Sequence, residues 1–229
     1  MSAASVPRTL PAHDVSPTTG PSTTAPTDEF GRLATDEEIA RAVAALEQNG
    51  IRTIVVPDAA TAKATVLGLL PEGSEVFDGS SQTLETLGLS EAIRSSPHLQ
   101  PVRPLLMQMM TEGRLRDQRK AGAAPDYFVG SVHAITQDGR LVVASASGSQ
   151  LGPYAYGAGS VIWVAGTQKI VPDLAAAFRR IEEYTFPLEN ERAKKAYGQG
   201  SVIAKLLVIN REVQPGRATL VLVKENLGY

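Results

Sequence analysis

A short loop at residues 78–83 carries the residue types that point most directly to chemistry. There, Asp78-Gly79-Ser80-Ser81-Gln82-Thr83 follows an expected strand and leads into an expected helix. A junction of this kind leaves backbone N–H groups free, and nearby hydroxyls can help them to bind a phosphate or a carboxylate. We therefore predict that Asp78, Gly79, Ser80, Ser81 and Thr83 contact a ligand. The alternative is that Ser81 and Thr83 only cap the helix.

Two further loops follow expected strands and are also rich in small residues. In residues 144–153 we predict that Gly148, Ser149 and Gln150 contact the ligand, because small residues allow a loop to pack against a flat group. A plain connector is the alternative for this loop. In residues 164–173, which lead from a strand into a helix, we predict that Gly166 and Thr167 bind the ligand.

Two ionisable side chains are the candidates for catalysis. Lys169 follows a strand end, where ligands of open α/β sheets gather, so it could place a positive charge beside a bound anion. A Schiff-base role would require a lowered pKa, and the alternative is a solvated loop lysine. Glu225 follows the last expected strand and is the best-placed carboxylate for catalysis or ligand contact. The alternative for Glu225 is pairing with Lys224 or with water.

Missing residue types exclude several kinds of chemistry. The chain has no cysteine, so it cannot form disulfides, a thiolate zinc site or a cysteine-bound iron–sulfur cluster, and we expect no cofactor in this chain. His98 and His133 are too few and too separated for a metal site. The 22 basic and 24 acidic residues give a net charge of -2, which argues against binding of nucleic acid or of a membrane surface.

The elements that must position these loops alternate between helix and strand. Thr35-Asp36-Glu37-Glu38 has the form of a capping box, which predicts a helix that ends at Asn49-Gly50. Asp138-Gly139 predicts the turn of an antiparallel hairpin between residues 134 and 143. Residues 105–122 are expected to form one long helix, and Pro187 is expected to interrupt a helix that starts at Pro172-Asp173. Expected strands cover residues 51–56, 74–77, 127–130, 161–165, 202–209 and 218–223.

The two ends of the domain are predicted from composition. Residues 1–34 are rich in Pro, Ser and Thr, which predicts a disordered tail, so a single domain is expected over residues 35–229. No apolar run approaches the roughly 20 residues that a spanning helix needs, and no signal-peptide core is present. Together with the absence of cysteine, this favours the cytoplasm.

Four motifs in a fixed order resemble the LUD domain family, namely lactate-utilisation proteins of the C type and their relatives, a bacterial type of protein. The motifs are Asp78 to Leu84, Asp126 to Thr136 with its Asp-Gly hairpin, Val161 to Leu174, and Glu225 to Tyr229. The resemblance implies an α/β fold similar to the NagB, ribose-phosphate isomerase and CoA-transferase group. This fold has a mainly parallel sheet flanked by helices, to which the strand pattern adds the antiparallel hairpin.

The same resemblance implies a role beside iron–sulfur proteins in the oxidation of L-lactate, a 2-hydroxy acid, to pyruvate. Many relatives carry cysteines where residues 191–201 have none, so we expect a non-redox protein that binds a small anionic metabolite or docks on an iron–sulfur oxidoreductase. The alternative is an isomerase, CoA transferase or cyclo-ligase that acts on a phosphorylated or CoA-linked metabolite, with Lys169 and Glu225 across a cleft between the Ser80 and Ser149 loops. The third possible function is that of a purely structural interaction module.

Overall fold

The computed structural model describes residues 28–229, and it confirms the predicted α/β class. Six parallel strands form the main sheet, and because they all point the same way, their carboxyl ends meet at one edge. The order across this sheet is β1 (Arg52–Val56), β10 (Ala218–Val223), β7 (Ser160–Gly166), β4 (Tyr127–Gly130), β2 (Glu75–Asp78) and β3 (Gln100–Pro101).

A second sheet of four strands contains the predicted hairpin. Its order is β8 (Ile170–Val171), β5 (Ala134–Thr136), β6 (Leu141–Ser145) and β9 (Lys205–Ile209), and β5 and β6 are antiparallel. The hairpin therefore does not extend the parallel sheet. Gly139 allows the hairpin turn to lie against α1 (Asp36–Gln48): its φ is +81°, and a Cβ there would lie 2.5 Å from the carbonyl carbon of Ala45.

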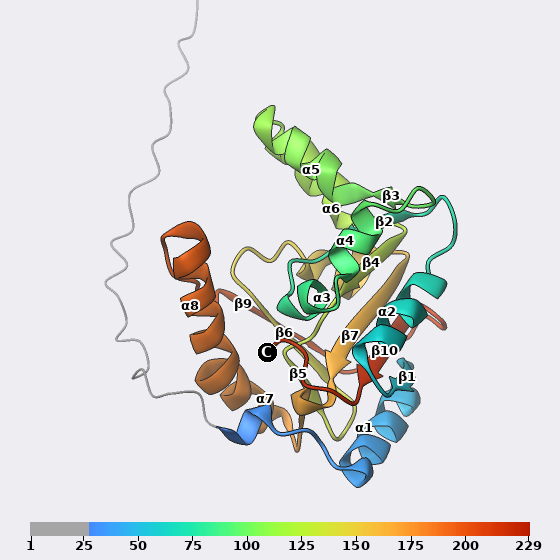
Figure 1. Cartoon of the computed structure of the whole chain (residues 1–229), viewed down its shortest axis with the longest axis vertical. Helices are drawn as coiled ribbons and strands as arrows, with labels where there is room; N and C mark the ends of the chain where they lie inside the picture. Colours follow the sequence, from blue (N-terminus) through green and yellow to red (C-terminus); the bar gives the residue numbers. More distant parts are fainter. Residues whose placement is uncertain (1–27) are drawn as a thin grey trace, which may run out of the picture.

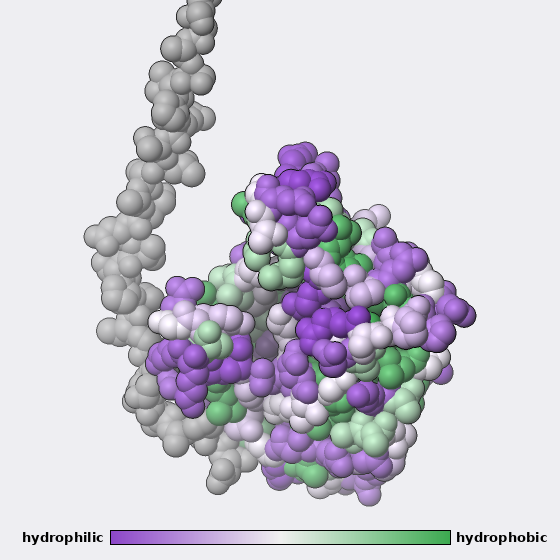
Figure 2. All heavy atoms as spheres, turned by 45° about the horizontal axis from the view of Figure 1, so that its top comes forward, coloured by the Kyte–Doolittle hydropathy of each residue, from purple (hydrophilic) through white to green (hydrophobic). Residues whose placement is uncertain are grey.

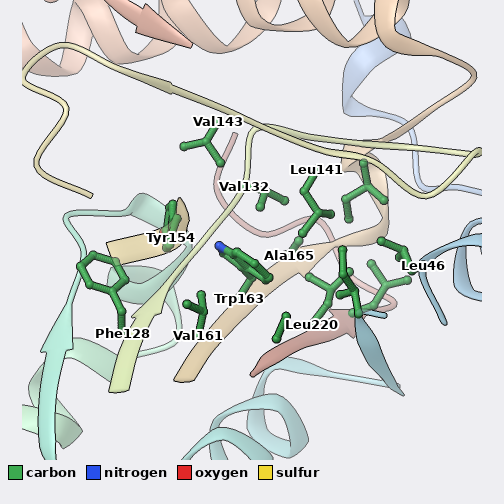
Figure 3. Close-up of a cluster of buried hydrophobic side chains, with 14 of the residues drawn as sticks. Leu46, Phe128, Val132, Leu141, Val143, Tyr154, Val161, Trp163, Ala165 and Leu220 are labelled. Carbon is green, nitrogen blue, oxygen red and sulfur yellow. The ribbon is translucent and has the colours of Figure 1, made fainter. Parts of the chain in front are cut away.

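The two sheets pack face to face, with helices on both outer sides (Figure 1). Side chains alternate along β7, so that Trp163 points toward the second sheet and Val164 points the other way. Trp163 lies at the centre of the cluster between the sheets (Figure 3). The outer side of the main sheet packs on α2 (Ala59–Gly68), α3 (Gln82–Thr86) and α4 (Leu89–Arg94), and the outer side of the second sheet packs on α7 (Leu174–Arg180) and the π-helical turn η4 (Ile181–Thr185).

Two helix predictions were wrong in detail. The single helix predicted for residues 105–122 is a pair, α5 (Val102–Thr111) and α6 (Leu115–Ala123), because Gly113 has a φ of +72° that reverses the chain. Pro187 does not interrupt its helix: α7 continues through η4 into α8 (Phe186–Tyr197). Pro187 lies in the first turn of α8, where the widened π turn accommodates the missing N–H of proline.

The residues before α1 are described only in part. Asp28–Gly31 forms a 3₁₀ turn, η1, and Phe30 is buried against α7 and the second sheet. The described structure therefore includes residues 28–34, which precede Thr35. The tail predicted for residues 1–34 otherwise lies outside the described residues and stays a prediction. Within residues 28–229, the apolar segments of the helices are too short for any helix to cross a bilayer.

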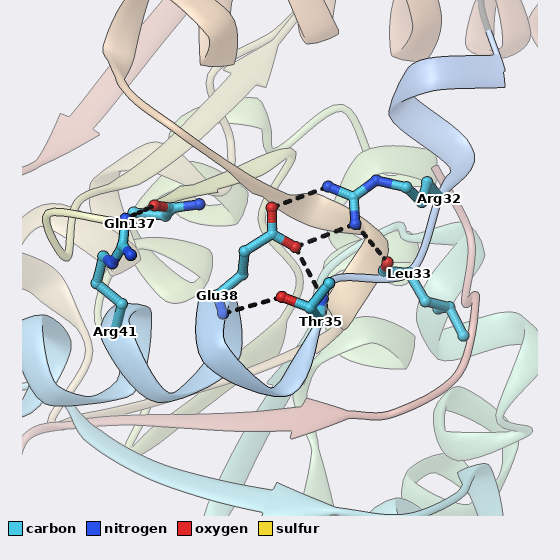
Figure 4. Close-up of polar contacts among 6 residues, drawn as sticks. All are labelled: Arg32, Leu33, Thr35, Glu38, Arg41 and Gln137. Atoms are coloured by element: carbon cyan, nitrogen blue, oxygen red, sulfur yellow. Dashed lines mark hydrogen bonds and ion pairs between the residues drawn. The ribbon is translucent and has the colours of Figure 1, made fainter.

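The capping box at the start of α1 gives a first prediction (Figure 4). The Thr35 hydroxyl accepts from the Glu38 N–H at 3.2 Å, and the Glu38 carboxylate accepts from the Thr35 N–H at 2.8 Å. Thr35→Ala is expected to lower the free energy of unfolding by about 0.5–2 kcal/mol, measured by urea denaturation. Thr111→Ala, at an exposed hydroxyl at the end of α5, is the control. An equal loss in both variants would show that the cap adds nothing.

Candidate functional site

A cleft of about 530 Å³ opens where the chain passes from the parallel sheet to the second sheet. Two short connections contribute to its floor: residues 131–133, between β4 and β5, and Lys169, at the end of the 3₁₀ turn η3 (Thr167–Lys169) between β7 and β8. The loop before α3, the loop after β6 and part of α8 form its walls. Many of the lining residues carry a hydroxyl group, namely Ser80, Ser81, Thr83, Ser131, Ser145, Ser147, Ser149, Thr185, Tyr197, Ser201 and Tyr229.

Lys169 lies at the floor of this cleft and is only 1% exposed. Its Nζ lies within hydrogen-bond distance of three oxygens: Thr83 Oγ1 at 3.0 Å, Ser131 Oγ at 3.1 Å and the Val132 carbonyl oxygen at 3.1 Å. No carboxylate within the described part of the chain forms an ion pair with it. Burial, and secondarily the charge of Arg180, lower the pKa of Lys169 well below its ordinary value. The lysine is thus an amine held by neutral oxygens.

Arg180 is a second buried basic side chain close to the floor. Its guanidinium donates to the carbonyl of His133, to Thr185 Oγ1 at 3.0 Å and to the Phe30 carbonyl at 3.4 Å. Burial lowers the pKa of Arg180 to about 10, so the group stays charged at neutral pH. Among residues 28–229 it has no carboxylate partner either, so a positive charge lies buried close to the floor of the cleft.

His133 also faces the cleft, and its hydrogen bonds fix its tautomer. Its Nδ1 lies 3.1 Å from the backbone nitrogen of Ala144, which can only donate. Nδ1 must therefore be unprotonated, and the neutral ring carries its hydrogen on Nε2. Burial, and then the charges of Lys169 and Arg180, lower the pKa of His133 to about 3. His133 thus offers the cleft a neutral N–H donor.

The folded His133 ring is expected to remain the neutral Nε2–H tautomer until the pH approaches about 3. Because the unfolded ring binds a proton near pH 6.5, the free energy of unfolding should fall as the pH drops from 6.5 toward 3, by up to about 1.4 kcal/mol per pH unit. NMR spectra of the ring nitrogens against pH measure this directly, with the urea-unfolded chain as reference. A folded ring that titrates near pH 6.5, or carries Nδ1–H, would contradict the assignment.

The two arginines that line the cleft are both paired with carboxylates. Arg103 Nε lies 3.1 and 3.2 Å from the two carboxylate oxygens of Asp78, and its Nη1 lies 3.4 Å from Ser80 Oγ. Asp78 is buried and does not line the cleft, so it positions Arg103. Arg192 makes two hydrogen bonds of 2.7 Å to Glu189, which also accepts from the Tyr229 hydroxyl at 2.7 Å. Burial alone would raise the pKa of Glu189, but these bonds lower it overall.

The predicted site residues are only partly brought together. The cleft is lined by Gly79, Ser80, Ser81, Thr83, Ser149, Gln150 and Lys169, whereas Asp78, Gly148, Gly166, Thr167 and Glu225 are not in its lining. Glu225 Oε2 accepts from the Ala59 N–H at 3.1 Å, at the start of α2. The structure therefore does not place Glu225 across the cleft from Lys169, and its catalytic role stays an untested prediction.

The motif at residues 225–229 instead packs against the cleft from one side. Gln168 Nε2 donates to the Leu227 carbonyl at 3.0 Å, and the Thr83 hydroxyl donates to the same oxygen at 3.2 Å. Gly228 has a φ of +62°, and a Cβ there would lie 2.6 Å from Thr83 Oγ1. These contacts hold Thr83 and Tyr229 in place.

Sequence reasoning missed many lining residues, among them Arg103, Ser131, Glu189, Arg192 and Tyr229. The sequence could have indicated Ser131, since it directly follows a strand, as do the three loops that are predicted to bind the ligand. The α8 residues had no such signal, because the chain reaches the cleft there only through tertiary packing. Among residues 28–229, no group of three or more His, Asp or Glu side chains could hold a metal ion.

Comparisons with known proteins agree with this fold. A family model described as the LUD domain matches residues 39–223. A crystal structure of a DUF162 family protein from Deinococcus radiodurans is similar over 84% of this chain and 99% of that chain, with a TM-score of 0.51 and 12% identity. The eIF2B delta subunit from Chaetomium thermophilum covers 63% of this chain and 57% of its own, at 14% identity and a TM-score of 0.32, too low to show a shared fold. No curated protein matches the chain.

Proposed function

The chain belongs to the LUD domain family, a lactate-utilisation type of domain, and on this basis we propose that it binds a small carboxylate metabolite, a 2-hydroxy or 2-oxo acid, in the cleft above Lys169. One observation carries the proposal. Lys169 is buried at the floor of an open cleft with many lining hydroxyls, Arg180 is buried close to that floor, and neither has a carboxylate partner in residues 28–229.

Buried basic groups are normally paired, because an unpaired buried charge is costly. A carboxylate ligand would supply the missing negative charge and would favour protonation of Lys169. The hydroxyls of the walls and the Nε2–H of His133 can then bind the remaining ligand oxygens. Arg103 and Arg192 already have carboxylate partners, which leaves the floor as the better site for a small anion.

In this proposal the protein takes part in the oxidation of L-lactate to pyruvate without transferring electrons itself. It would hold the 2-hydroxy acid or its 2-oxo product while iron–sulfur partner proteins carry out the redox step. The absence of cysteine and the match to the LUD domain are the two supports for this role.

Calorimetric and thermal-shift titrations with L-lactate, pyruvate, ribose 5-phosphate, ATP and acetyl-CoA test the proposal. A carboxylate at about 100 times its Kd should stabilise the fold by about 2.7 kcal/mol. Titration in buffers of different ionisation enthalpy should show proton uptake as Lys169 becomes charged. Lys169→Met should abolish binding, whereas Lys195→Met, at an exposed lysine on α8, should keep it. No carboxylate binding, or binding that survives in Lys169→Met, would overturn the proposal, and a response to CoA or phosphate ligands alone would favour the enzyme alternative.

A second observation supports a docking partner. Leu105, Met107, Met110 and Leu115 are exposed on the projecting hairpin formed by α5 and α6. Figure 2 shows hydrophilic residues over the tip of this hairpin, at the top of the view, with hydrophobic residues on its flank. We propose that an iron–sulfur subunit docks here. Met107→Glu should weaken binding of a purified lactate-oxidising iron–sulfur subunit, whereas Glu91→Gln on α4 should not.

A further inference from the structure

We propose that Ser131 and Lys169 form a nucleophile–base pair that transfers acyl groups from activated esters or thioesters to water. The proposal concerns an activity of the cleft, whereas the function proposed above concerns binding, so the two can fail separately. It begins from the 3.1 Å contact between Ser131 Oγ and Lys169 Nζ. Both residues line the cleft, and Ser131, the nucleophile, keeps 9% of its surface exposed.

The hydrogen bonds around Lys169 fit a neutral amine whose lone pair points at Ser131. The Thr83 hydroxyl donates to the Leu227 carbonyl, so Thr83 Oγ1 accepts from Lys169. The Val132 carbonyl can only accept. These two acceptors use both hydrogens of a neutral amine, and the third short contact is then a hydrogen bond from the Ser131 hydroxyl to Nζ.

A charged lysine fits the same site less well. It would donate to all three oxygens, and the Ser131 hydroxyl would have to turn to Thr83 Oγ1 at 3.3 Å or to the Val132 carbonyl at 3.4 Å. The neutral form uses only the contacts of 3.0–3.1 Å around Nζ. A nucleophile within hydrogen-bond distance of a base, with that base oriented by a third group, is the arrangement of Ser–Lys catalytic pairs.

Three elements hold this arrangement rigid. Ser131 directly follows β4, Lys169 ends η3 and Thr83 lies in α3, so each residue comes from a different part of the carboxyl edge of the main sheet. The Ser131 carbonyl accepts from the buried Tyr154 hydroxyl at 3.1 Å, which fixes the backbone beneath the nucleophile. Thr83 acts as a positioning residue, since it holds the amine without reaching the acyl carbon.

The reaction needs no oxidant and no cofactor. Ser131 Oγ attacks the acyl carbon while its proton passes to Lys169 Nζ. The bond from the acyl carbon to the leaving oxygen or sulfur then breaks, and Lys169 returns the proton to the leaving group. Water attacks the acyl–Ser131 ester by the same route: it gives a proton to Lys169, which protonates Ser131 Oγ as the carboxylic acid leaves. The product is a small carboxylic acid, the ligand class proposed for the cleft.

The test uses p-nitrophenyl acetate as an oxygen ester and S-phenyl thioacetate as a thioester, with the full-length protein. We expect release of the leaving group and one acetyl group on Ser131, located by mass spectrometry after an acid quench. Ser131→Ala should abolish the acetylation, and Ser131→Cys should retain it on the new thiol. Lys169→Met should slow acylation by about 100-fold or more. Ser96→Ala, at a half-buried position, and Lys120→Met, at an exposed one, lie outside the cleft and should change neither result.

The pH profile separates a base from a purely structural lysine. The rate of acylation should rise with pH as Lys169 loses its proton, and it should reach a plateau at a pH below the ordinary lysine pKa of about 10.4. Arg180 and His133 are the other titratable groups near Nζ, and both keep a constant charge between pH 5 and 9. Thr83→Val should shift this profile toward lower pH, because it removes an acceptor that stabilises the charged amine, and Thr83→Ser should restore it. A flat profile, or acetyl groups on surface lysines but not on Ser131, would overturn the proposal, whereas carboxylate binding by Ser131→Ala would leave the proposed function intact.

Discussion

The free energy of unfolding is expected to rise with pH, from the pH at which folded Lys169 loses its proton up to about pH 9.5, and Lys169→Met is expected to remove most of this rise. Lys169 is fully buried without a carboxylate partner, and burial and then Arg180 lower its pKa well below 10.5. The unfolded lysine keeps its proton up to about pH 10.4. Between these two pKa values, unfolding therefore takes up one proton.

The sign of the effect follows from this proton uptake. Stability rises by about 1.4 kcal/mol for each pH unit in the window, and it falls as the pH drops toward the folded pKa. Burial raises the pKa of Tyr154 and of Tyr229, so their ionisation would lower stability at still higher pH. The window therefore ends before tyrosines ionise.

The readout is the difference in unfolding free energy between wild type and Lys169→Met as a function of pH. This difference isolates Lys169, because all other titrating groups are common to both proteins. The absolute difference also includes the free energy of the hydrogen bonds that Thr83 and Ser131 lose. The test is therefore how this difference changes with pH. Lys195→Met, at an exposed lysine, controls for the loss of one positive charge. A difference that stays constant with pH would show that Lys169 remains protonated in the folded state.

The strand ends of the parallel sheet are the part of the site that the sequence predicts well. Short β-branched segments bounded by Gly, Pro and Asp locate β1, β2, β4, β7 and β10 to within one or two residues. Loops after such strands must share one edge, and this rule alone places Ser80 and Lys169 in the same region. The same rule does not bring Glu225 into this region, because β10 lies beside β1 and the Glu225 carboxylate contacts the start of α2.

Partners distant in sequence are the part that could not be predicted. The sequence shows that Asp78 is charged and follows a strand, but its pairing with Arg103 depends on how α5 packs against β2. The hairpin pattern at Asp138-Gly139 predicts two antiparallel strands without showing that they form a separate sheet. The floor of the cleft exists only because β4 and β7 each continue into that second sheet. Lys169 is buried because the chain passes from one sheet to the other at this point.

Glu212→Gln is expected to lower the free energy of unfolding by about 3–5 kcal/mol, because it leaves a buried arginine without its carboxylate. Arg217 Nη1 lies 2.6 Å from Glu212, and the two side chains are 5% and 12% exposed. The remaining guanidinium hydrogens are donated to the carbonyls of Pro153, Tyr154 and Ala158 at 2.8–3.2 Å. The Arg217–Glu212 pair thus links the π-helical turn η2 (Pro153–Gly157) to the start of β10.

Urea denaturation measures the loss, with Glu191→Gln as the matched control. Glu191 pairs with Lys194 at 2.7 Å on the exposed side of α8, where such a pair contributes only about 0–1 kcal/mol. The double variant Glu212→Gln with Arg217→Met should recover much of the stability, because it removes the unpaired charge. Equal losses in Glu212→Gln and Glu191→Gln would show that Arg217 is compensated by its carbonyl partners alone. The Tyr154 hydroxyl also donates to the Ser131 carbonyl, so a loosened η2 should also disturb the position of Ser131 at the floor of the cleft.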